Sequence, residues 1–130
     1  MIEIDDLRGV VARNLADAAI FALSADNRLG LAYEAVLILS KMSVHAAGYR
    51  VRSGAVGAHK VTLQGAEIAI GPSIANTIAY FDRLRRMRNQ LSYDVAGSTS
   101  DAEANSALAQ AQAFQTLVEG WIAANHPTLV

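Results

Sequence analysis

Apolar residues recur at three- and four-residue intervals along most of the chain, which is the spacing of one face of an α-helix. The first such run predicts a helix over residues 5–25. Its apolar stripe consists of Leu7, Val10, Val11, Leu15, Ala18, Ala19 and Ala22. Asp5 and Asp6 stand at its start, where negative charge favours the helix dipole.

A second helix is predicted over residues 28–47, with Asp26 or Asn27 as its N-cap. Gly48 follows its last apolar position, as expected for a glycine that ends a helix. Because the break between the first two helices is short, we expect them to pack as an antiparallel hairpin. The glycine-containing segment 49–58 is expected to form a mobile surface loop.

Three further helices complete the pattern. The third covers residues 59–70, and the fourth runs from Ile74 to about Asp94 behind Ser73 as a cap. The fifth begins at a capping box formed by Ser100 and Glu103 and runs to about Asn125. No segment alternates apolar and polar residues as a strand would, so the prediction is an all-α antiparallel bundle of about five helices.

Composition and charge narrow the class of protein. The 130 residues suit a single domain over 1–130, and 52% hydrophobic residues can supply a good core. A formal net charge of −1 provides no overall attraction to nucleic acid or anionic membranes, so any anion site must be local. The chain has no cysteine and an acidic start, and its apolar runs are too short for a membrane span; a cytoplasmic protein is expected.

The fourth predicted helix carries the most distinctive residues. At about 100° per residue, one stripe of this helix faces the core or a partner and includes Arg88 among apolar residues. The other members of the stripe are Thr77, Phe81, Leu84, Leu91 and Val95. A guanidinium beside apolar surface needs oxygen partners. It can pair internally, for example with Asp94 or Glu34, or extend its charged end to solvent, or bind a phosphate.

Residues 83–94 resemble the signature helix of the HEPN superfamily, in which an Arg-Asn pair is followed by three residues and a His. Arg88 and Asn89 align with that pair, and residues 48–50 together with His59 resemble a Gly-Tyr-Arg and His stretch of one bacterial HEPN-like branch. The resemblance implies a helical bundle, a homodimer with facing signature helices and, in many members, metal-independent RNA cleavage. It also implies a toxin–antitoxin or defence component with a nucleotidyltransferase partner.

Tyr93 occupies the position where the nuclease members carry His. A phenol with a pKa of about 10 is a poor general base at neutral pH, so the ribonuclease motif is degenerate. Arg88 and Asn89 can still hold and orient a phosphate, with Arg85 adding positive charge. Tyr93 either packs at the helix edge and bonds a neighbour, or contacts a nucleotide or RNA backbone.

The remaining candidates are a basic loop and the histidines. His59, with Arg50, Arg52 and Lys60, can close over an anion beside the fourth helix, or it can simply be a solvated residue at a helix start. The three histidines lack the spacing of metal ligands, and no glycine motif for phosphates or dinucleotides is present. We therefore expect no metal and no cofactor.

Three functions remain open from the sequence. The preferred one is binding of RNA or a nucleotide phosphate in a dimer cleft. The first alternative is a weak metal-independent ribonuclease with Tyr93 or His59 as the proton carrier. The second is a non-catalytic dimerisation or interaction protein in which Arg88 and Asn89 bond across the homodimer.

Overall fold

The structure is a computed structural model that describes residues 4–49, 58–91 and 99–129, with the backbone alone over residues 87–91. These residues form five α-helices and two short 3-10 turns, and no strand occurs among them. The helices are α1 (Ile4–Ala18), α2 (Ala25–Ala46), α3 (Ala58–Ile70), α4 (Ala75–Leu91) and α5 (Asp101–Asn125), and the turns are η1 (Pro72–Ile74) and η2 (Pro127–Leu129). The predicted all-α fold is confirmed.

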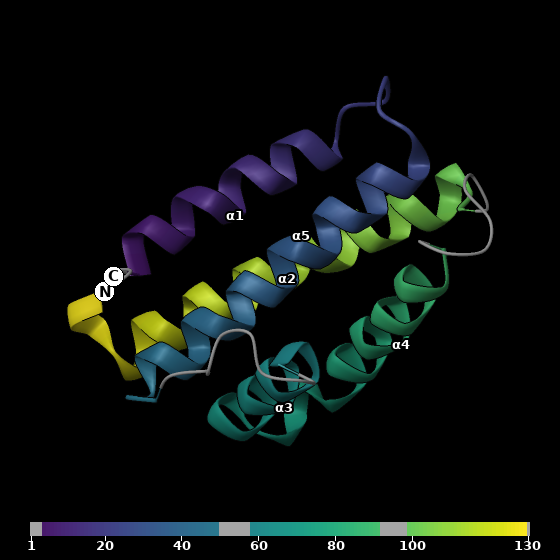
Figure 1. The fold of residues 1–130 in the computed structure, drawn as a ribbon. Helices are drawn as coiled ribbons and strands as arrows, with labels where there is room; N and C mark the ends of the chain where they lie inside the picture. Colours follow the sequence, from purple (N-terminus) through teal and green to yellow (C-terminus); the bar gives the residue numbers. More distant parts are fainter. Residues whose placement is uncertain (1–3, 50–57, 92–98, 130) are drawn as a thin grey trace.

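The helix α2 is the centre of the bundle. It packs against α1, α3, α4 and α5, and 13 of its 22 residues are buried. Figure 1 shows α1, α2 and α5 as long helices lying alongside one another, with α3 and α4 on the other side of α2. α1 and α2 form the predicted antiparallel hairpin. Because every other helix packs against α2, side chains of α2 take part in an interface with each of the other four helices.

The core is built from the apolar stripes of all five helices. Phe81 of α4 and Phe114 of α5 are buried, and their ring centroids lie 6.5 Å apart. Leu39, Met42 and Val44 of α2 are also buried. Burial of aromatic and aliphatic side chains of this size is the main favourable contribution to folding.

The boundary between α1 and α2 differs from the prediction. α1 ends at Ala18 instead of residue 25, and the next amides bond three residues back, as in a tight turn. The N-cap of α2 is Ser24, whose Oγ accepts a hydrogen bond from the amide of Asn27 at 3.2 Å. The predicted caps Asp26 and Asn27 were therefore wrong, because both residues already lie inside α2.

The other helix ends agree more closely with the prediction. Gly48 has a φ of 94°, the conformation expected of a glycine just beyond a helix. The capping box of α5 is present, with reciprocal hydrogen bonds between Ser100 and Glu103. Ser73 was wrong as a cap because it lies inside η1, which precedes α4. The predicted loop residues 50–57 and the last residues of the fourth predicted helix, 92–94, lie outside the described residues.

An ion pair joins the start of α1 to the end of α5. Arg8 Nε donates to both Glu119 carboxylate oxygens, at 3.1 and 2.8 Å, and Arg8 Nη1 contacts Asp5 at 2.6 Å. The hydrogen bond to Glu119 raises the pKa of Arg8. This guanidinium therefore remains charged wherever the protein is folded, and it holds α1 against α5 at one end of the bundle.

Candidate functional site

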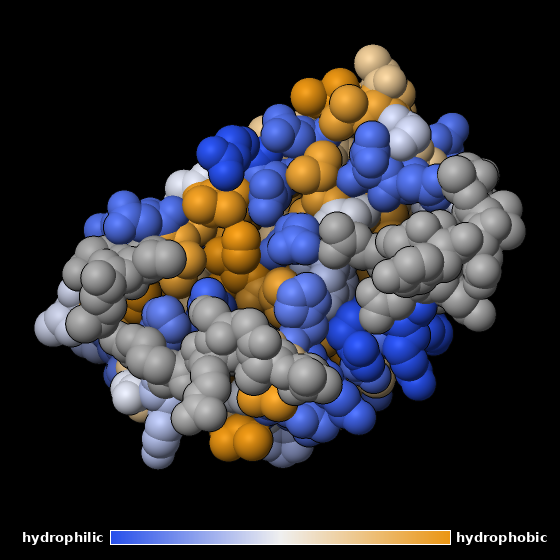
Figure 2. All heavy atoms as spheres, viewed as in Figure 1, coloured by the Kyte–Doolittle hydropathy of each residue, from blue (hydrophilic) through white to orange (hydrophobic). Residues whose placement is uncertain are grey.

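The rotation of α4 is set by its apolar residues. Ile78, Phe81 and Leu84 are at most 5% exposed and pack into the core. Arg83, Arg85 and Arg86 therefore lie on the flanks and the outer side of the helix. Hydrophilic atoms gather over this part of the molecule in Figure 2, whereas the neighbouring surface over α3 is partly hydrophobic.

Asp82 contacts two of these arginines. Arg85 Nε donates to Asp82 Oδ1 at 3.0 Å, and Arg86 Nε lies 3.9 Å from Asp82 Oδ2. The Arg85 side chain is 21% exposed and that of Arg86 is 65% exposed. One carboxylate between two guanidinium groups fixes the direction of Arg85 more firmly than that of Arg86, because only Arg85 is within hydrogen-bonding distance.

The segment stays positive despite this carboxylate. Arg83, Arg85 and Arg86 carry three positive charges against the one negative charge of Asp82, which leaves a net charge of +2 over residues 82–86. The Arg83 guanidinium lies 5.4 Å from the centroid of the Tyr80 ring and is exposed. A local positive field of this kind can attract an anion even though the whole chain is slightly acidic.

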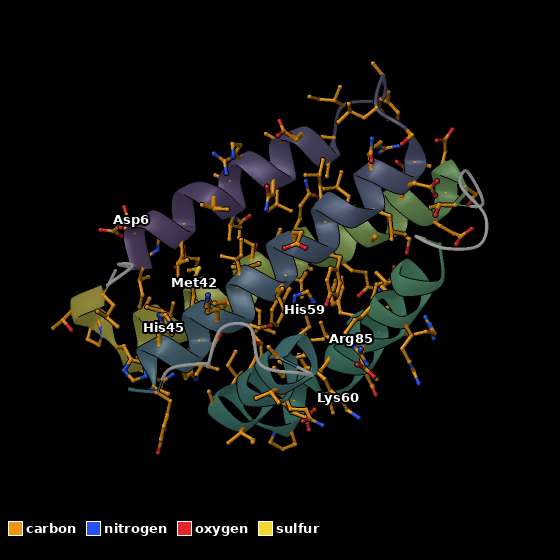
Figure 3. All side chains as sticks on the ribbon, viewed as in Figure 1. Asp6, Met42, His45, His59, Lys60 and Arg85 are labelled. Atoms are coloured by element: carbon orange, nitrogen blue, oxygen red, sulfur yellow. The ribbon has the colours of Figure 1, made fainter. Side chains whose placement is uncertain are left out.

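His59 stands in the first turn of α3 and is tied to the core. Its Nδ1 lies 3.1 Å from the hydroxyl of Tyr33, which is fully buried on α2. The two rings are tilted by 43° with their centroids 6.0 Å apart. Figure 3 shows His59 between α3 and α2, with Lys60 next to it on α3 and Arg85 on α4. The imidazole of His59 is therefore exposed, while its Nδ1 atom is hydrogen-bonded to the buried hydroxyl of Tyr33.

The predicted site residues are only partly described. Arg85 and His59 are placed as above. Arg88 and Asn89 belong to α4, and because that helix continues to Leu91, residue 88 falls one turn after Leu84 on the predicted stripe. The side chains of these two residues lie outside the described part, as do Tyr93, Arg50 and the suggested partner Asp94. Their proposed contacts remain predictions.

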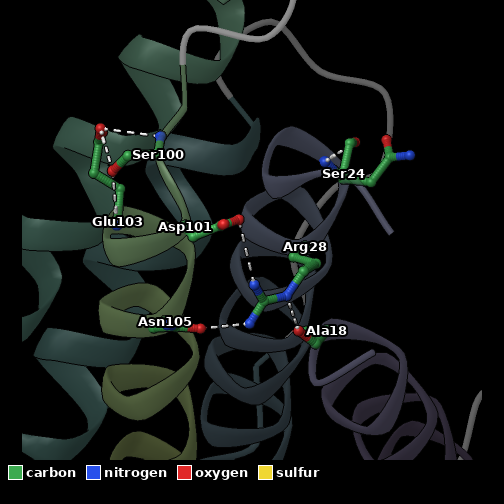
Figure 4. Close-up of polar contacts among 8 residues, drawn as sticks. Ala18, Ser24, Arg28, Ser100, Asp101, Glu103 and Asn105 are labelled. Atoms are coloured by element: carbon green, nitrogen blue, oxygen red, sulfur yellow. Dashed lines mark hydrogen bonds and ion pairs between the residues drawn. The ribbon is translucent and has the colours of Figure 1, made fainter. Parts of the chain in front are cut away.

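A buried arginine was missed by the sequence reasoning. Arg28 on α2 is 1% exposed and donates from Nε to the carbonyl of Ala18 at 2.8 Å and from Nη2 to Asn105 Oδ1 at 2.6 Å. Its Nη1 lies 4.0 Å from Asp101 Oδ1, and the ring of Phe21 lies 4.7 Å from its Cζ. This cluster joins the end of α1, α2 and the start of α5 (Figure 4). Its guanidinium is enclosed, so we interpret it as a structural contact.

The signal for Arg28 was present in the sequence. It shares the helical stripe of α2 with five buried residues, at steps of four, three, four, three and four. Those residues are Ala32, Ala35, Leu39, Met42 and Ala46. A charged residue in such a stripe is expected to be buried with partners.

An open apolar cavity lies where α2 ends against α3. Its volume is about 480 Å³, and it is lined by Val44, Ala47, Tyr49, Gly65, Ile68 and Ala69. Tyr49 is 71% and Ile68 85% exposed. None of the described residues that line this cavity is charged, and none of them belongs to α4.

The described residues contain neither a metal-binding cluster nor a membrane-spanning helix. Within residues 4–49, 58–91 and 99–129, no group of three or more His, Cys, Asp or Glu side chains is arranged to hold a metal ion. None of the helices described there is long and apolar enough to cross a membrane. Neither observation changes the candidate site, which rests on α4 and on the start of α3.

No known protein family, curated protein or solved structure matches this chain. The candidate site therefore rests on the residues and their geometry.

Proposed function

We propose that this chain is a HEPN-like cytoplasmic domain that binds RNA or a nucleotide phosphate between two copies of itself. The observation that carries the proposal is the net charge of +2 over residues 82–86, on the helix that continues directly into Arg88 and Asn89. The order of helices and the helical state of the Arg-Asn pair are both compatible with the resemblance.

The site residues have different roles in this proposal. Arg88 and Asn89 hold and orient a phosphate, as the resemblance implies, and Tyr93 donates a hydrogen bond. Arg85 acts through its charge, because its Nε is already bonded to Asp82. His59 binds from the side of α3, and Arg50 from the segment that precedes α3 in the sequence. A phosphate needs several such donors, since each exposed contact alone contributes little.

The experiment is fluorescence anisotropy with labelled single-stranded RNA. If about three phosphates are contacted, affinity falls roughly 20-fold between about 50 and 200 mM salt. Arg88→Ala should weaken binding about tenfold and make it less dependent on salt. Arg13→Ala, which removes an exposed arginine from α1, is the matched control and should leave affinity unchanged. Absent or salt-independent binding in the wild-type protein would contradict the proposal.

The resemblance also implies a biological role for the proposed phosphate-binding site. In this proposal the chain works as a toxin–antitoxin or defence component beside a nucleotidyltransferase. If it retains weak ribonuclease activity, with Tyr93 or His59 as the proton carrier, cleavage must proceed in the presence of a chelator and disappear in Arg88→Ala. Cleavage that needs added metal would contradict this alternative.

A second candidate function is a non-catalytic dimerisation or interaction protein. It is favoured by one observation: Asp82 contacts both Arg85 and Arg86, so part of the positive charge is compensated within α4. In this case Arg88 and Asn89 bond across the homodimer. Arg88→Ala would then lower the mass measured by light scattering, while neither variant nor wild type would bind RNA.

A further inference from the structure

Tyr33 connects the centre of the bundle to its surface. The side chain belongs to the core, with no exposed area, yet its hydroxyl lies 3.1 Å from Nδ1 of the exposed His59. A hydrogen bond to a buried hydroxyl offsets the loss of its contacts with water, so this contact stabilises the fold. It also fixes which nitrogen of the imidazole faces inward.

The tautomer of the imidazole decides the direction of this hydrogen bond. A phenol can donate or accept, and a neutral imidazole has one donor and one acceptor nitrogen, so Tyr33 either donates to an unprotonated Nδ1 or accepts from a protonated one. When Tyr33 donates to Nδ1, the ring proton of His59 must lie on Nε2. Nε2 is at the opposite edge of the ring from Nδ1, on the side away from Tyr33.

We propose that Tyr33 is a positioning residue that holds His59 with its proton on Nε2, so that Nε2 donates a hydrogen bond to a phosphate oxygen of bound RNA. This inference rests on the proposed function and makes it more specific. In the neutral ring, Nε2 is a donor and His59 is a phosphate-binding group. It does not accept a proton there, which disfavours His59 as a general base.

A purely structural role for the Tyr33 hydroxyl makes a different prediction. In that case Tyr33→Phe lowers stability and changes RNA affinity by the same factor whether or not His59 is present. A positioning role predicts that the effect on affinity requires the imidazole. A double-mutant cycle separates the two roles, because it measures the interaction between the two side chains.

The cycle uses the same labelled RNA at low salt. His59→Ala should weaken binding about tenfold, and Tyr33→Phe about threefold, as expected for one hydrogen bond. In the His59→Ala background, Tyr33→Phe should have no further effect. Tyr80→Phe is the matched control, because that hydroxyl lies 3.4 Å from Ser106 and far along the chain from His59. Equal effects of Tyr33→Phe in both backgrounds, or none in either, would overturn the inference.

A second measurement separates this inference from the proposed function. Ring signals of His59 are followed by NMR while inorganic phosphate is added, with His45 and His126 as internal references. The expected result is a larger shift at His59, which Tyr33→Phe reduces. If RNA does not bind but this shift is observed, the proposed function fails and the phosphate site stands. If His59 responds no more than the other two histidines, the inference is overturned.

Discussion

Arg28 places a positive charge inside the bundle, in the first turn of α2. Its guanidinium bonds a backbone carbonyl of α1 and the amide oxygen of Asn105 on α5, while Phe21 covers one face. Among the described residues, Nη1 has no hydrogen-bond partner. The planar guanidinium group of arginine is needed here, because two of its nitrogens must reach acceptors on different helices.

Replacing Arg28 tests how much its guanidinium group contributes to stability. Arg28→Lys keeps the charge but cannot reach both acceptors, so we expect it to lower the free energy of unfolding by about 3 kcal/mol. Arg28→Met removes the charge and should cost less, about 1–2 kcal/mol from the two unpaired acceptors. Urea unfolding measures both values, with the exposed Arg13→Lys as a neutral control. A lysine variant as stable as wild type would contradict this interpretation.

Single residues also show where sequence reasoning reached its limit. The stripe containing Phe81 and Leu84 was predicted because helical spacing alone decides which residues face the core. The Tyr33–His59 contact could not be predicted. These two residues are 26 positions apart, and their meeting depends on how α3 crosses α2. The side chains of Arg88, Asn89 and Tyr93 lie outside the described residues, so that part of the HEPN resemblance and of the site stays a prediction.

At the scale of elements, α2 and α3 approach each other closely at a glycine of α3, Gly65. A Cβ atom built on Gly65 would lie 2.8 Å from Cγ2 of Val44, which is closer than two such carbon atoms pack. Valine is stiff about its first side-chain torsion and cannot easily move aside. Gly65 is therefore required by the distance between the two helices.

We expect Gly65→Ala to destabilise the protein by about 1–3 kcal/mol, because overpacking outweighs the better helix propensity of alanine. Gly120→Ala on α5 is the matched control, since no atom lies within 4 Å of a Cβ at that position. That change should raise the free energy of unfolding by about 0.5–1 kcal/mol. Adding Val44→Ala to the Gly65→Ala variant should relieve the overpacking and restore part of the stability. A Gly65→Ala variant more stable than wild type would contradict the steric requirement for glycine at this position.

Helix boundaries illustrate a second limit. The capping box of α5 was predicted because all its bonds lie within four residues. The early end of α1 was missed, because apolar residues continue beyond Ala18 and the carbonyl of that residue is bonded by Arg28, ten positions later. Local signals thus predicted local structure, and contacts between helices decided where α1 ends.

At the scale of the whole molecule, α2 couples the other four helices to one another. Since each of them packs on α2, none can separate without exposing part of the shared core. Small domains with one core usually unfold in a single step. The proposed homodimer adds a dependence on concentration, because dimer formation stabilises the folded chain by mass action.

A dimer of this size should therefore melt at a temperature that depends on protein concentration. For a homodimer, a tenfold increase in concentration is expected to raise Tm by about 3 °C. Circular dichroism at two concentrations measures this shift. Arg88→Ala should reduce it if that residue lies at the contact between copies. A Tm that is the same at both concentrations would contradict the homodimer.

The close approach of α2 and α3 at Gly65 also affects the imidazole of His59, six residues earlier on α3. α3 contacts α2 through the close packing of a Val44 methyl group against Gly65 and through the hydrogen bond between the Tyr33 hydroxyl and His59 Nδ1. Two such contacts on one helix restrict its sliding and turning, so the proposed phosphate-binding imidazole is held by a rigid support. A methyl group added at Gly65 would push α3 away from α2 and displace the imidazole of His59, and we expect this to weaken the proposed phosphate binding although Gly65 itself makes no contact with the ligand.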